Sequence, residues 1–114
     1  MEFEFAKLVP PYTDQPGPQA VARLVERCIQ HRGSSTEPIA DFVISLYNAD
    51  YAKPDAYLLC RRIDDKHFRD VITVMTWFRS VPGGLDVHWV FGREGARLMQ
   101  KLIDDFDRQP PPGR

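Results

Sequence analysis

A helical pattern of apolar residues runs through residues 65–80, DKHFRDVITVMTWFRS. Residues three and four apart share one face of an α-helix, so this spacing predicts a helix. The apolar positions form two adjacent stripes: Phe68, Val71, Ile72, Met75 and Phe78 in one, and Val74, Trp77 and Val81 in the other. A helix that is apolar over so wide an arc is usually central in its domain. We therefore expect residues 65–80 to be the central helix and Met75→Asp to abolish folding, because an unpaired carboxylate would be buried.

Capping and stop signals flank this helix and suggest others along the chain. Asp64 is placed to cap it, and the Pro82-Gly83-Gly84 sequence ends it. The same criteria predict further helices at about residues 18–31, 37–49, 56–62 and 92–107. The first begins near Pro18, Thr36 or Glu37 caps the second, and Asp55 caps the short third, which is also compatible with a strand. The second has apolar residues around much of its surface and should be buried on more than one side.

Two segments alternate apolar and other residues with the period of a strand, residues 1–9 and 85–91. The fold class is therefore predicted as an all-α bundle of four to five short helices, with a minor two-stranded β element from residues 3–8 and 85–91 as the alternative at those segments. Residues 1–108 should form one domain. The Pro-rich residues 109–114 should form a flexible tail.

Composition places the chain among ordinary globular domains. It has 114 residues, of which 43% are hydrophobic and 27% charged, and its net charge is −1. That balance gives none of the basic excess common in proteins that bind nucleic acid. Cys28 and Cys60 lie in apolar surroundings and are expected to be core thiols. The chain starts without the basic and apolar run of a signal peptide and contains no apolar run long enough to cross a bilayer, so a cytoplasmic protein is expected.

The densest polar stretch lies where residues 61–70 enter the predicted helix. Asp64, Asp65 and His67 are candidates for a metal or acid–base site. The favoured interpretation is structural, with a capping carboxylate at Asp64 and a second carboxylate that complements the helix dipole. The basic residues of the same stretch form a candidate patch for anions or nucleic acid: Arg61, Arg62, Lys66 and Arg69.

Aromatic residues outside the stripes suggest where a protein could bind. Tyr51 and Trp89 are the candidate interface residues, because tyrosine and tryptophan are enriched at binding hot spots. His88, beside Trp89, is interpreted as a structural histidine. The sequence contains no nucleophile elbow, Cys-x-x-Cys motif or phosphate-binding glycine loop. It therefore predicts no catalytic, cofactor-binding or metal-binding residues.

Residues 39–50, IADFVISLYNAD, together with Leu58 to Phe78 and the closing helix, resemble a family of small uncharacterised bacterial proteins. The resemblance covers residues 20–106 and departs from the family at Ser45-Leu46-Tyr47, where the family favours tryptophan. The resemblance implies the helical fold of that family. It also implies a gene of the kind that is often carried on plasmids, phages or integrated elements. It implies no activity and no site residues.

These observations lead to three hypotheses of function. The first is a small non-enzymatic interaction or regulatory module that binds another protein. The alternatives are a nucleic-acid-associated accessory protein that uses the basic patch, and a metal-binding or acid–base enzyme at Asp64, Asp65 and His67. The sequence leaves both a monomer and a homodimer open, because a helix as broadly apolar as residues 65–80 can form an interface if its neighbours do not cover it.

Overall fold

The computed structural model describes residues 7–83 and 85–108, and this part of the chain is entirely helical, without strands. The α-helices are α1 (Pro16–Gln30), α2 (Glu37–Tyr47), α3 (Ala56–Arg61), α4 (Asp65–Ser80) and α5 (Gly95–Asp105). Two 3-10 helices, η1 (Tyr12–Asp14) and η2 (Val87–Glu94), complete the element order. The predicted all-α fold is confirmed, whereas the predicted tail at residues 109–114 lies outside the described residues. None of the described helices is long and apolar enough to cross a membrane.

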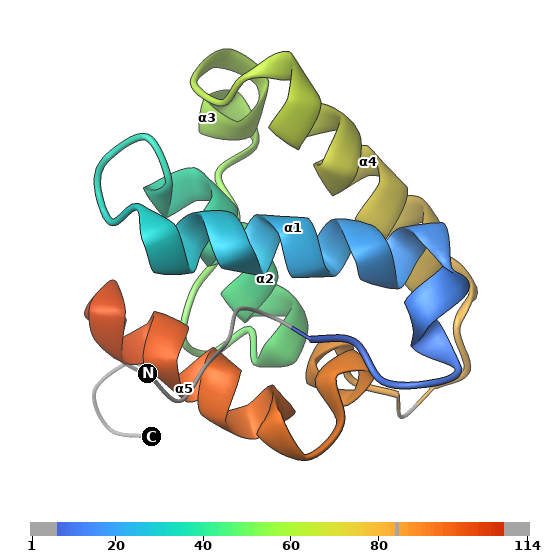
Figure 1. Cartoon of the computed structure of the whole chain (residues 1–114). Coiled ribbons are helices and arrows are strands. Elements are labelled where there is room, and N and C mark those ends of the chain that lie inside the picture. Colours follow the sequence, from blue (N-terminus) through green and yellow to red (C-terminus); the bar gives the residue numbers. More distant parts are fainter. Residues whose placement is uncertain (1–6, 84, 109–114) are drawn as a thin grey trace.

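The centre of the molecule is α2. It packs against α1, α3, α5 and η2, and Figure 1 shows it behind α1 and above α5. Its buried side chains are spread around much of the helix and not confined to one face: Pro38, Ile39, Ala40, Phe42, Val43 and Ile44. The prediction that this helix is buried on more than one side is confirmed. The prediction that residues 65–80 form the central helix is wrong.

Helix α4 lies at one edge of the molecule, where it packs along α1 (Figure 1). Val71 and Val74 are buried there, at 2% and 1% exposure. Ile72 and Met75 are 47% and 53% exposed, because no described segment covers their side of the helix. The premise of the Met75→Asp prediction is therefore wrong. The wide apolar arc of α4 therefore consists of two adjacent stripes, one packed against α1 and the other exposed to solvent.

Local capping follows the sequence closely at two helices. The Asp55 carboxylate accepts a hydrogen bond from the Leu58 N–H of α3 at 3.1 Å, and the Asp64 carboxylate accepts one from the His67 N–H of α4 at 3.0 Å. These bonds satisfy N–H groups that have no partner inside the helix. Thr36 precedes α2 but makes no such bond. Its fully buried hydroxyl donates instead to the His31 carbonyl at 2.7 Å, which closes the turn between α1 and α2.

The predicted β element is wrong at residues 85–91, because most of this segment belongs to η2. Its buried residues, Val87, Val90 and Phe91, follow the helical three-and-four spacing within the apparent alternation. One backbone hydrogen bond, from the Val9 N–H to the Val90 carbonyl at 3.0 Å, joins η2 to the N-terminal segment. Gly92 adopts φ 62°, and a Cβ there would lie 2.9 Å from a Val9 methyl group. Residues 3–6 of the proposed strand pair lie outside the described residues.

Candidate functional site

An apolar groove lies between α3 and α4, with Phe42 of α2 reaching it from the core. We call it the α3–α4 groove. It encloses about 270 Å³, and its lining includes Phe42, Leu59, Cys60, Phe68, Ile72 and Met75. The exposed position of Cys60 shows that the prediction of a core thiol there is wrong. Cys28 is a core thiol as predicted, and burial raises its pKa to about 12.

The wall of this groove on α4 continues onto the open surface as an apolar stripe, which consists of Phe68, Ile72 and Met75. Two of the three side chains, those of Ile72 and Met75, are about half exposed. Scattered apolar residues are normal on a protein surface, but a patch that continues into an apolar groove is typical of a binding site. Sequence reasoning named none of these residues as a site, although the breadth of the apolar arc signalled them.

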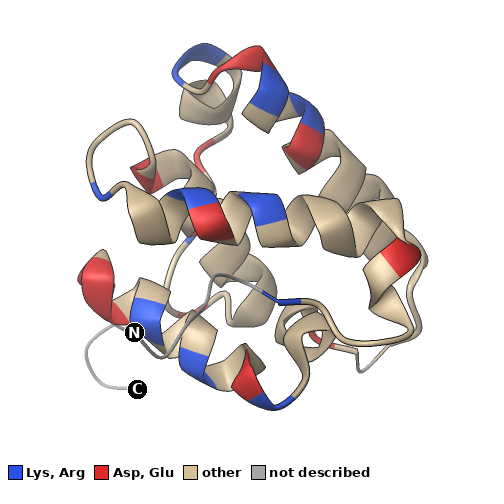
Figure 2. Ribbon diagram, viewed as in Figure 1, with Lys and Arg blue, Asp and Glu red and all other residues tan. Residues whose placement is uncertain are grey.

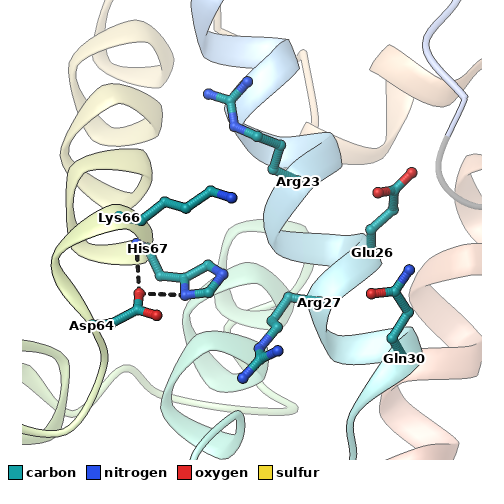
Figure 3. Close-up of a pocket in the computed structure, with 7 residues that line it drawn as sticks. All are labelled: Arg23, Glu26, Arg27, Gln30, Asp64, Lys66 and His67. Carbon is teal, nitrogen blue, oxygen red and sulfur yellow. Dashed lines mark hydrogen bonds and ion pairs between the residues drawn. The ribbon is translucent and has the colours of Figure 1, made fainter.

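A second, polar depression lies between α1 and the start of α4 (Figure 3). It encloses about 360 Å³, and its lining consists of Arg23, Glu26, Arg27, Gln30, Asp64, Lys66 and His67. Figure 3 shows the His67 ring beside the Asp64 carboxylate, and the two atoms Nδ1 and Oδ1 lie 2.5 Å apart. The pKa of the Asp64 carboxyl is lowered, mainly because the His67 backbone N–H donates to it and also because the His67 ring and Arg27 lie nearby.

One cation of this depression, Arg23, is paired within the fold. Asp70, 6% exposed, accepts the Arg23 Nε–H between its two carboxylate oxygens and a second hydrogen bond from Arg23 Nη2 at 2.8 Å. The hydrogen bonds to Asp70 raise the pKa of Arg23. The structure thus brings Asp64 and His67 together as the sequence suggested, but Asp65 does not line the depression. Among residues 7–83 and 85–108, no three histidine, cysteine or acidic side chains converge in a group that could hold a metal ion.

The four residues of the predicted basic patch are exposed around the junction of α3 and α4: Arg61, Arg62, Lys66 and Arg69. Figure 2 shows the basic positions there interleaved with acidic ones. Arg61 lies over the Tyr57 ring, 6.0 Å from its centroid, and Lys66 reaches the polar depression. The patch is therefore divided between different surfaces, which sequence spacing alone did not reveal.

The two predicted interface residues lie apart from the α3–α4 groove. Trp89 is 53% exposed on η2, whereas Tyr51 is half-buried and packs against the core. Neither side chain lines the groove. Next to Trp89, the His88 ring meets Tyr47 edge to face with centroids 4.8 Å apart. Burial lowers the pKa of His88, and its buried Nδ1 makes no hydrogen bond within the described part of the chain.

Comparison with known proteins identifies a family and nothing more specific. Residues 18–107 match a family model described as "Family of unknown function (DUF7673)". No curated protein matches this chain, and no solved structure matches it. The bacterial setting on mobile elements that the sequence resemblance implies stays a prediction.

Proposed function

We propose that this chain, which belongs to the DUF7673 family of unknown function, has a non-enzymatic role as a small protein-interaction module. The observation that carries this proposal is the apolar stripe of α4, which is open to solvent beside the α3–α4 groove. Ile72 and Met75 leave about half of their surface in water. Removing that surface from water on binding is favourable by roughly 25 cal/mol per Å² of apolar area.

The shape of this surface favours a helical partner. The stripe runs along α4, and the α3–α4 groove beside it is lined by apolar side chains from α2, α3 and α4. An amphipathic helix binds such a groove by laying its own apolar residues, three and four apart, along the groove. We therefore propose that the partner presents an apolar helix face to Phe68, Ile72 and Met75.

The remaining reactive groups support a binding role over an enzymatic one. The buried Cys28 thiol, with a pKa of about 12, is protonated at neutral pH and is a poor nucleophile. The Asp64 carboxylate is occupied by capping α4 and by its contact with His67. The first of these interactions is the helix cap that the sequence predicts.

Photo-crosslinking from Met75 tests the proposal directly. A photoreactive amino acid replaces Met75 in the full chain, and a matched chain carries it at Gln100, which is exposed on α5. We expect protein adducts in cells from position 75 and not from position 100. The absence of adducts above the control level would overturn the proposal. The mass of an adduct identifies whether the partner is another protein or a second copy of the chain.

A second candidate function is binding of nucleic acid by the exposed basic residues at the α3–α4 junction. Arg62, Lys66 and Arg69 make no side-chain ion pair within the described part of the chain, which leaves them available for phosphates. Binding through these residues should weaken steeply as salt rises. Retention on heparin at low salt that Lys66→Ala and Arg69→Ala reduce would support this candidate. No retention at low salt would remove it.

A further inference from the structure

We infer that the apolar stripe of α4 binds the same stripe of a second copy of this chain, with the two α4 helices antiparallel across a two-fold axis at Ile72. This inference rests on the proposed function and names its partner. A two-fold interface uses one surface patch on both subunits, so the patch must be complementary to itself. The α4 helix satisfies that condition through both its apolar and its charged residues.

The charged residues that flank the stripe at the two ends of α4 have opposite signs. Asp65 lies in the first turn of α4 and Arg79 in its last turn. Each is seven residues from Ile72, which is about two turns of helix and returns to nearly the same face. Both side chains are exposed, and neither makes an ion pair within the described part of the chain. Asp65, Ile72 and Arg79 therefore form one line, with an acidic end, an apolar middle and a basic end.

An antiparallel arrangement brings these unlike ends together. When the two copies cross at Ile72, Asp65 of each faces the partner's Arg79, and the ion pair forms twice. The antiparallel helix dipoles also favour this orientation, because the positive end of one helix lies near the negative end of the other. A parallel arrangement would bring like charges together at both ends, which is unfavourable.

The apolar residues between the charges complete the match. Phe68 and Met75 lie on either side of Ile72 along the stripe. In the antiparallel pair, Phe68 of each copy lies near the partner's Met75, beside an α3–α4 groove on each chain. The interface would cover the side chains of Ile72 and Met75, which are 47% and 53% exposed in the single chain. The opposite charges at the two ends of α4 thus make this face complementary to a second copy of itself, as a two-fold interface requires.

Charge exchange in the purified full chain tests this arrangement by sedimentation over a concentration series. We expect a concentration-dependent dimer for the unaltered chain. Asp65→Arg and Arg79→Asp should each weaken the dimer about tenfold, since two ion pairs become like-charge contacts. Lys66→Asp, an exposed change that faces the polar depression, is the control and should leave the dimer unchanged.

Mixing the two single variants gives the sharpest result. The Asp65→Arg chain carries a cation at both ends of its stripe, and the Arg79→Asp chain carries an anion at both ends. We expect the mixture to form a heterodimer at concentrations where each variant alone is monomeric. The double variant Asp65→Arg/Arg79→Asp should regain self-association. A purely structural role of these charges predicts the opposite, because both changes oppose the helix dipole and the double variant should be the least stable.

Two outcomes would overturn the inference. One is a chain that stays monomeric at every concentration, and the other is a mixture of single variants that does not associate. The fate of the proposed function is decided separately by the crosslinking experiment. An adduct from position 75 to a different protein, with a monomeric purified chain, would retain the interaction module and remove self-association. The absence of any adduct would remove both.

Discussion

Arg23 of α1 and Asp70 of α4 form a two-pronged ion pair that ties the edge helix to the body of the molecule. Arg23 Nη2 lies 2.8 Å from Asp70 Oδ1, and Nε lies 3.1 Å from Oδ2. The Asp70 side chain is 8% exposed and the Arg23 side chain 48%, so solvent reaches the arginine far more than the carboxylate. Since α4 lies on α1 with one face open, this pair helps to fix which face of α4 remains outward.

Arg23→Ala should destabilise the fold by about 1–3 kcal/mol, because it leaves the Asp70 carboxylate buried without its partner. Arg32→Ala is the matched control, since Arg32 is 61% exposed and its partner Asp105 also pairs with Lys101. The control should change stability by less than about 0.5 kcal/mol. Urea unfolding of both variants measures the difference. Equal effects would contradict a structural role for the Arg23–Asp70 pair.

The α1 backbone lies close to the Trp77 side chain of α4 at Gly17. A Cβ at this position would lie 2.2 Å from the Cβ of Trp77, where no flexible side-chain end can yield. Gly17→Ala should therefore cost about 1–3 kcal/mol of stability through overpacking. Gly33→Ala meets nothing within 4 Å and is the control. A Gly17→Ala variant with unchanged melting temperature would show that α1 and α4 lie farther apart than described.

The partly buried ring of His88 should make stability depend on pH. Burial lowers its pKa in the folded chain below the ordinary value of 6.5, while nearby Asp86 opposes that shift. The unfolded chain then binds a proton near pH 6.5 that the folded chain takes up only at lower pH, so acidification favours unfolding. Above that range both states hold a neutral ring, and the effect vanishes. The unaltered chain should therefore lose stability relative to His88→Gln as pH falls below about 6.5. A constant difference would contradict the burial of His88.

The two cysteines should react at very different rates with a thiol reagent. Cys60 is exposed in the α3–α4 groove, whereas Cys28 is fully buried with a pKa raised to about 12. We expect one thiol to react in the folded chain and the second only after denaturation. Cys60→Ser should remove the fast reaction and leave the slow one. Fast reaction of both thiols without denaturant would contradict the described core.

Much of the fold could be predicted from periodicity and caps, because both are local. Asp55 and Asp64 start their helices where the sequence places them, and α4 has the predicted bounds. The position of each helix in the molecule could not be predicted this way. The arc of apolar residues on α4 is the same whether a second element of the chain covers Met75 or a partner does. Likewise, the alternation in residues 85–91 hid the three-and-four spacing of Val87, Val90 and Phe91, and Cys60 gave no local sign that it faces outward.

The candidate site depended on the same tertiary information. The prediction of Tyr51 and Trp89 as interface residues rests on residue type, which does not report burial, and Tyr51 packs against the core. The apolar stripe of α4 was visible in the sequence as a surplus of apolar positions. Only the packing of α4 on α1 distinguishes Val74, which lies inside, from Met75, which lies outside.

Thermal unfolding of Val74→Asp and Met75→Asp in dilute solution tests the central claim, that the apolar stripe of α4 lies on the surface, where a partner can reach it, and not in the core. The two residues are adjacent on one helix, and their exposed fractions are 1% and 53%. Val74→Asp should prevent folding, because it buries a carboxylate without a partner. Met75→Asp should melt within a few degrees of the unaltered chain. Loss of folding in Met75→Asp comparable to that in Val74→Asp would place the stripe in the core and contradict the account.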